Sequence, residues 1–352
     1  MHIHNRGMTR WTIACWAVFA AALARAEEIE LTVVTSWAKN IEFAADALLL
    51  VDEVNKAGKG VVRLKYLGGP EVIPQRQHAY ALKRGVIDIY FGAATYTIGL
   101  APESDAFLGA SITPAEARAK GAYRPIEETW NRKLNAHFLG WHQTGPHLHI
   151  FTRDQPQLKP DGLPEVGGLR IRGTPTYRAF LEAVGAIMVD IPSSDVYTAL
   201  ERGTVDAIAW TGTSMASEGF QKFVRWRVDP GVLQYAMTAQ INLDRWNSLS
   251  PAARQILEDQ AAQYEIESRK RFTARAEEER QLLLGEGVQG FELTSDAAGR
   301  YRAIANEAVW ARMAKSAPES AAILRPLFDP GGAAARRVSA VAPDGASPPA
   351  LR

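Results

Sequence analysis

The apolar and polar positions between residues 168 and 212 alternate in blocks that predict a repeating strand–helix unit. Short runs of apolar and β-branched residues are typical of strands. The stretches between them have the apolar spacing of amphipathic helices, and a glycine marks the end of each. Strands that alternate with helices in this way form a parallel sheet. The predicted strands are residues 168–173, 186–191 and 205–210, and the predicted helices are residues 177–185 and 194–202.

A similar pattern precedes this stretch and predicts a second α/β unit. Gly- and Pro-rich segments at 67–74 and 155–167 predict loops, and residues 95–108, which Pro102 interrupts, give no clear assignment. The predicted strands are residues 30–36, 61–66, 86–91, 137–141 and 147–152, and the predicted helices are residues 38–56, 77–83 and 115–135.

A very long helix is predicted after the extended run at residues 234–243. Ser250 is a favourable N-cap, Pro251 suits the first helical position, and no strong helix breaker follows before Gly285. A helix of about 35 residues is about 50 Å long, which exceeds one domain. Further helices are predicted at residues 296–316 and 318–327.

Two side chains of the central stretch are candidates for ligand binding. Arg172 stands near the end of the first predicted strand, and Trp210 ends the last one. Binding sites in open α/β sheets lie at the carboxyl ends of strands. A guanidinium there can hold a carboxylate through two parallel hydrogen bonds. The alternative is a structural ion pair between Arg172 and Asp190 or Asp206.

The N-terminus has the pattern of a signal peptide. Arg6 and Arg10 precede the apolar run at residues 11–23, and Ala-Arg-Ala at 24–26 supplies a small-x-small cleavage site. The run is short for a membrane span. We therefore expect residues 1–26 to be removed and the chain to be periplasmic, with an uncleaved anchor as the alternative.

Composition narrows the function further. Without residues 1–26 the chain has 37 basic and 39 acidic side chains, a net charge near −2, and no cysteine. This predicts neither nucleic-acid binding, nor attraction to an anionic membrane, nor thiol chemistry. Residues 329–352 consist mainly of Gly, Ala, Pro, Ser and Arg, which predicts a disordered tail.

The order and spacing of several sequence blocks resemble the solute-binding proteins of tripartite ATP-independent periplasmic (TRAP) transporters, the DctP family. The segment 85–88 and residues 246–250 fit the same pattern. The central blocks are Leu-Arg-Ile-Arg at 169–172, Val-Gly-Ala at 184–186, Asp-Val-Tyr-Thr-Ala-Leu at 195–200 and Gly-Thr-Val-Asp at 203–206.

The resemblance implies an α/β fold of the type II periplasmic-binding-protein kind, with two domains around a cleft and a domain-spanning helix. It also implies a small organic-acid ligand, delivery to the small and large TRAP membrane subunits, and no cofactor or direct membrane insertion of the mature chain. The expected divisions are residues 27–146, 147–235, 236–277 and 278–328, assigned alternately to the first and second domains.

By the same resemblance, Arg172 has the place of the carboxylate-binding arginine, and His149 that of a second, variable arginine. Trp210 matches a branch that binds 2-oxo acids and lactate. In that branch a glutamate helps to hold a cation where this chain has Gln234, so the metal-assisted mode is in doubt and Gln234 is expected to bond the ligand directly. The remaining candidates, on cleft-facing loops of the first domain, are Trp37, Glu71 and Tyr96.

Other functions are less well supported by the sequence. His142, His147 and His149 lie close together, but no fourth ligand or HExxH motif completes a zinc site. No nucleophile elbow or paired-carboxylate signature is present. We expect a receptor for a 2-oxo or 2-hydroxy monocarboxylate or a C4-dicarboxylate. The alternative is a secreted enzyme that acts on a small carboxylate.

Overall fold

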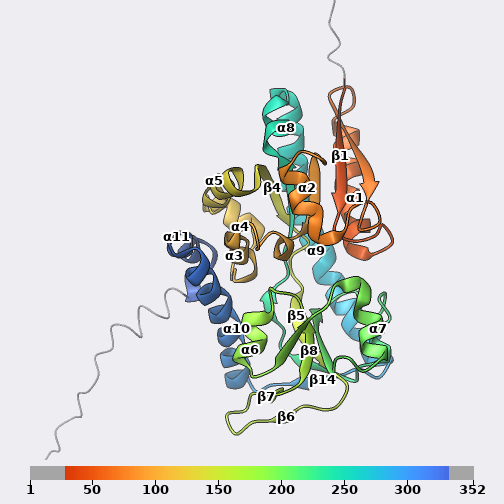
Figure 1. The fold of residues 1–352 in the computed structure, drawn as a ribbon, viewed down its shortest axis with the longest axis vertical. Coiled ribbons are helices and arrows are strands. Elements are labelled where there is room, and N and C mark those ends of the chain that lie inside the picture. The colour runs from red at the N-terminus through yellow and green to blue at the C-terminus, as the bar shows by residue number, and fades with distance from the viewer. Residues whose placement is uncertain (1–27, 333–352) are drawn as a thin grey trace, which may run out of the picture.

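The computed structural model describes residues 28–332, and in it two α/β domains are stacked along the long axis of the molecule (Figure 1). Each domain is built on its own sheet. The predicted signal peptide at residues 1–26 lies outside the described residues, as does the predicted tail after residue 332.

The first domain contains a five-stranded sheet in the order β2-β1-β3-β13-β4. The strand β1 pairs in parallel with β2 and β3, whereas β13 is antiparallel to both β3 and β4. The strands are β1 (Ile29–Thr35), β2 (Val62–Gly68), β3 (Ile89–Ala93), β4 (Ala136–His142) and β13 (Met237–Asn242). The helices of this domain are α1 (Glu42–Ala57), α2 (His78–Lys83), α3 (Asp105–Leu108), α4 (Pro114–Ala119), α5 (Tyr123–Leu134) and α8 (Leu243–Ser248), with 3₁₀ turns η1 (Gln75–Gln77), η2 (Ala94–Tyr96) and η3 (Pro102–Ser104).

The second domain contains the larger sheet, ordered β14-β11-β5-β10-β8-β9, with β12 paired to β5. The predicted parallel unit is confirmed, because β8 pairs in parallel with both β9 and β10. The strands are β5 (His147–Thr152), β8 (Arg170–Gly173), β9 (Ile187–Asp190), β10 (Ala207–Thr211), β11 (Trp226–Asp229), β12 (Val232–Gln234) and β14 (Gln289–Glu292). Its helices are α6 (Arg178–Ala183) and α7 (Val196–Glu201), with 3₁₀ turns η4 (Ser193–Asp195) and η5 (Phe220–Lys222), and the predicted loop at 155–167 contains the short pair β6 (Gln157–Leu158) and β7 (Pro164–Glu165).

The predicted long helix is present as α9 (Pro251–Gly285). It begins where the sequence predicts, because Ser250 Oγ accepts a hydrogen bond from the backbone N–H of Ala253. The helix runs past both sheets, contacting β4 and α1 in the first domain and β14 in the second. One rigid element therefore links the two domains.

The chain also crosses between the domains at residues 143–146, between β4 and β5, and at residues 235–236, between β12 and β13. Two last helices follow β14: α10 (Ser295–Ser316) and α11 (Pro318–Phe328). The helix α10 contacts α6 in the second domain and α3 in the first. The helix α11 differs from the expected assignment of residues 278–328 to the second domain, because Leu324 and Phe328 are buried in a core with Phe107 and Trp141 of the first domain.

Candidate functional site

A cavity of about 50 Å³ lies between the two domains. Since a water molecule needs roughly 10–15 Å³ on this measure, the space corresponds to about four waters. Its walls are chemically different on the two sides. The first domain and the crossing segment contribute the aromatic side chains Trp37, Phe43, Tyr96 and Tyr235, whereas the second domain contributes Arg172, several hydroxyl groups and Trp210.

Arg172 lies in β8, at the carboxyl end that the sequence predicts for a site. Its side chain is buried, at 1% exposure, and burial lowers its pKa. Among the described residues the guanidinium makes one hydrogen bond, from Nε to the carbonyl oxygen of Ile191 at 2.9 Å. Its Cζ also lies 4.7 Å from the ring centre of Trp210. An arginine remains charged even when buried. The strand β8 therefore places a positively charged side chain in the wall of the cavity.

The structural ion pair considered as the alternative role of Arg172 is absent from residues 28–332. Asp190 forms an ion pair with Arg76 at 2.8 Å, and Asp206 forms one with Arg170 at 2.7 Å. No carboxylate of the described residues lies within 4.0 Å of the Arg172 guanidinium. Within residues 28–332, Arg172 is therefore a buried cation with no carboxylate in ion-pair contact, although Asp190 and Glu218 act on its charge at longer range.

The aromatic groups of the cavity are fixed by contacts with one another. The ring centres of Trp37 and Phe43 are 5.0 Å apart, and those of Trp37 and Tyr96 are 6.1 Å apart. On the other wall Trp210 donates from Nε1 to Ser214 Oγ at 3.0 Å and meets Phe220 edge-on. Burial raises the pKa of Tyr96 to about 12, so its hydroxyl stays protonated and can act as a donor.

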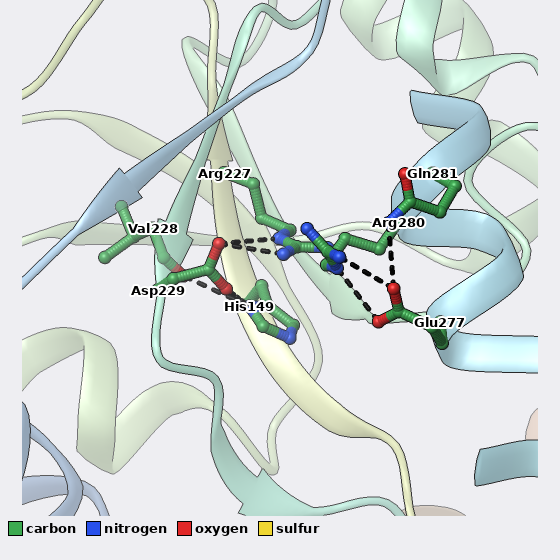
Figure 2. A network of polar contacts seen from close by, with 7 residues as sticks. All are labelled: His149, Arg227, Val228, Asp229, Glu277, Arg280 and Gln281. Atoms are coloured by element: carbon green, nitrogen blue, oxygen red, sulfur yellow. Dashed lines mark hydrogen bonds and ion pairs between the residues drawn. The ribbon is translucent and has the colours of Figure 1, made fainter. Parts of the chain in front are cut away.

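His149 lies outside the cavity wall, unlike the predicted ligand contact. Its Nδ1 is 3.1 Å from Asp229 Oδ1 and 3.1 Å from the carbonyl oxygen of Val228. Figure 2 shows His149 and Arg227 both contacting the Asp229 carboxylate, beside the Arg280–Glu277 pair of α9. The interactions of His149 are therefore with neighbouring strands of the second domain.

Gln234 and Glu71 also lie outside the wall of this cavity. Gln234 donates to the carbonyl oxygen of Ile112 at 3.2 Å and accepts from Arg269 at 3.0 Å, so its amide is used in linking the domains. Glu71 accepts a hydrogen bond from the backbone N–H of Gly69 at 2.7 Å and so stabilises the loop in which both residues lie. The expected direct contact of Gln234 with a ligand is not supported.

Of the seven candidates, the structure brings Arg172, Trp210, Trp37 and Tyr96 together. It adds wall residues that the sequence analysis missed, namely Phe43, Thr174, Thr176, Tyr177, Ser193 and Tyr235. Four of them follow the ends of β8 and β9, so the same strand-end rule that selected Arg172 could have found them. Phe43 and Tyr235 had no such signal.

Two properties of residues 28–332 bear on other functions. They contain no group of three or more His, Cys, Asp or Glu side chains that could hold a metal ion. No helix in this part of the chain is long and apolar enough to cross a membrane.

Comparisons with known proteins agree on one family. Residues 33–316 match the family model described as bacterial extracellular solute-binding protein, family 7. A solute-binding protein of Albidiferax ferrireducens is 24% identical over 171 residues, which is 47% of this chain and about half (49%) of that protein. The monocarboxylate 2-oxoacid-binding periplasmic protein of Nostoc sp. is 21% identical over 72% of this chain and 71% of its own length.

Solved structures show the same fold. A TRAP transporter solute-binding protein from Bordetella bronchiseptica superposes with a TM-score of 0.73, covering 89% of this chain and 95% of its own, at 22% sequence identity. That protein was described with copurified calcium and picolinate bound in its active site. The two-domain α/β architecture predicted for this chain is thereby confirmed.

Proposed function

This chain belongs to family 7 of the bacterial extracellular solute-binding proteins, the DctP family of TRAP receptors, and from that premise we propose that it captures a small monocarboxylate in the periplasm. The acid is bound between the two domains and then delivered to the small and large TRAP membrane subunits. The family consists of receptors rather than enzymes, and we propose no catalytic step.

The observation that supports the proposal most directly is the unpaired charge of Arg172. A buried cation is unfavourable unless an anion and hydrogen bonds compensate for its lost hydration. The protein supplies one carbonyl oxygen, and the guanidinium can donate further hydrogen bonds. A ligand carboxylate fits this need, because it is planar, charged and able to accept two parallel hydrogen bonds.

The lining of the cavity favours a ligand with one carboxylate over a ligand with two. Arg172 is the only basic side chain among the described residues that line the cavity. A second carboxylate of a C4-dicarboxylate would have to be buried against aromatic rings and hydroxyl groups without a cation. The small volume and the aromatic wall suit a compact monocarboxylate, and a 2-oxo acid is consistent with the Nostoc relative.

The test is calorimetric titration after a thermal-shift panel of monocarboxylates, C4-dicarboxylates and sugar acids has identified the acid. Arg172→Ala should weaken binding by roughly two orders of magnitude, since each hydrogen bond to a charged group contributes about 1.5–3 kcal/mol. Arg172→Lys keeps the charge but loses the forked geometry, so it should rescue binding only in part.

Unchanged affinity in Arg172→Ala would place the carboxylate elsewhere. Stabilisation by dicarboxylates alone would overturn the monocarboxylate assignment. Recovery of a chemically altered acid from the titration cell would favour the enzyme alternative, because a receptor returns its ligand intact.

A further inference from the structure

We infer that the indole N–H of Trp37 is a second ligand-binding donor, so that the receptor selects monocarboxylates carrying an uncharged hydrogen-bond acceptor that faces the first domain. This inference rests on the proposed function, because it assumes that an acid occupies the cavity. It adds a requirement that the Arg172–carboxylate pair alone does not impose.

Trp37 is held in place by the loop that follows β1. Its carbonyl oxygen accepts a hydrogen bond from Thr35 Oγ1 at 2.8 Å. The amide of Gln75 donates to the neighbouring carbonyl oxygen of Ser36 at 2.7 Å. Gly69 packs so closely that an added Cβ would lie 2.3 Å from the Trp37 carbonyl oxygen. The indole is therefore presented to the cavity by a backbone that is fixed on several sides.

The indole N–H is buried but unpaired. Trp37 is 7% exposed, and its Nε1 has no hydrogen-bond partner among residues 28–332. Thr95 Oγ1, in the same wall, is buried and unpaired as well. Buried Trp N–H groups normally find an acceptor, and leaving one unpaired costs free energy. A ligand in the cavity can recover that free energy only if it brings an acceptor, because the indole cannot accept a hydrogen bond.

The surroundings define the acceptor as uncharged. The rings of Phe43 and Tyr96 are the aromatic neighbours of Trp37 in the wall. A second anionic group placed here would lose its hydration without gaining a counter-ion. A keto or hydroxyl oxygen, or a ring nitrogen beside an aromatic carboxylate, satisfies the N–H without that loss.

The experiment compares matched acids that differ only in the acceptor. Pyruvate is paired with propionate, 2-oxobutanoate with butanoate, and picolinate with benzoate, and the dissociation constants are measured by calorimetry. In at least one pair, the acid with the acceptor should bind about tenfold more tightly than the matched acid without it. A tenfold difference in the dissociation constant corresponds to the free energy of one well-formed hydrogen bond. Trp37→Phe keeps an aromatic ring without the N–H. It should reduce that ratio to near one, because only the acceptor-bearing acid loses a hydrogen bond.

Trp141→Phe is the matched control. Trp141 Nε1 is also buried and unpaired, but Trp141 lies in the core of the first domain, away from the cavity wall. This variant should keep the wild-type ratio. Because each ratio is measured within one protein sample, a change in the folded fraction cancels.

The outcomes separate the two proposals. An unchanged ratio in Trp37→Phe, or no ratio above about twofold in wild type, would overturn the Trp37 inference while carboxylate binding stands. If no acid binds, or if binding is insensitive to Arg172→Ala, the proposed function itself fails and the inference fails with it.

Discussion

At the scale of single residues, His142 shows how a buried titratable group links stability to pH. It is fully buried in the first domain, stacked on Phe91 with ring centres 5.5 Å apart, and Tyr264 lies 4.9 Å away on the same measure. Neither ring nitrogen has a hydrogen-bond partner among the described residues. Burial, with a smaller contribution from Arg118, lowers the pKa of His142 to about 3. The imidazole is therefore neutral in the folded protein.

We expect His142→Phe to flatten the acid side of the stability profile. The pKa of a histidine in the unfolded chain is near 6.5, so below that pH the unfolded state takes up a proton that the folded state does not. This contribution to stability is complete above about pH 6.5 and is lost as the pH falls toward about 3. Between about pH 7.5 and pH 5, wild type should lose about 2 kcal/mol more than the variant in urea unfolding. Equal losses of stability in wild type and variant would mean that His142 takes up a proton in the folded protein as readily as in the unfolded chain.

At the scale of elements, the first domain presents Trp37 through the contact between two loops. The segment after β1 carries Trp37, and the segment after β2 carries Gly69. An added Cβ at Gly69 would lie 2.3 Å from the carbonyl oxygen and 2.7 Å from the carbonyl carbon of Trp37. These atoms belong to the backbone, so they cannot move aside as the end of a flexible side chain can. Glycine is required here by close approach rather than by an unusual φ.

Gly69→Ala should therefore push the two loops apart. We expect a loss of about 1–3 kcal/mol in the free energy of unfolding, the usual range for overpacking. The preference for acceptor-bearing acids should weaken as well, because Trp37 moves with its loop. Gly99→Ala is the control, since a Cβ there meets no atom within 4 Å. Wild-type stability and selectivity in Gly69→Ala would show that the loops yield without cost.

At the scale of the whole molecule, an ion pair joins the two domains outside the cavity. Arg76, in η1 of the first domain, lies 2.8 Å from Asp190 at the end of β9 in the second. Both side chains are partly exposed, at 54% and 26%. Two-domain receptors close on their ligands by hinge motion. An ion pair that spans the domains therefore favours the arrangement in which they lie together.

Removal of this pair by Arg76→Ala should speed ligand release. A partly exposed ion pair contributes about 0.2–1 kcal/mol, which corresponds to a dissociation faster by a factor of roughly 1.4 to 5. The effect should shrink at high salt, where exposed charges are screened. Stopped-flow release is the measurement. Arg124→Ala is the control, because its partner Glu128 lies on the same helix. If Arg76→Ala releases the acid at the wild-type rate at low salt, the pair does not hold the closed state.

The sequence by itself determined the elements of the fold, because their signals are local. The apolar period and the glycines marked the strands and helices of the central stretch, and Ser250 with Pro251 fixed the start of α9. The rule that sites lie at strand ends also selected Arg172. Residues 115–135, expected to be largely helical, form two helices, α4 and α5, and the break between them lies where Gly121 has a φ of 68°.

Only the tertiary structure decided which groups meet. Trp37 and Arg172 are far apart in the chain, yet they line one cavity because α9 and the two crossings bring the domains together. Asp229 engages His149, and Arg269 engages Gln234, so these candidates have protein partners instead. Helix α11 docks on the first domain because its apolar face completes a core there. Partner choice of this kind depends on long-range packing, which local patterns along the chain do not contain.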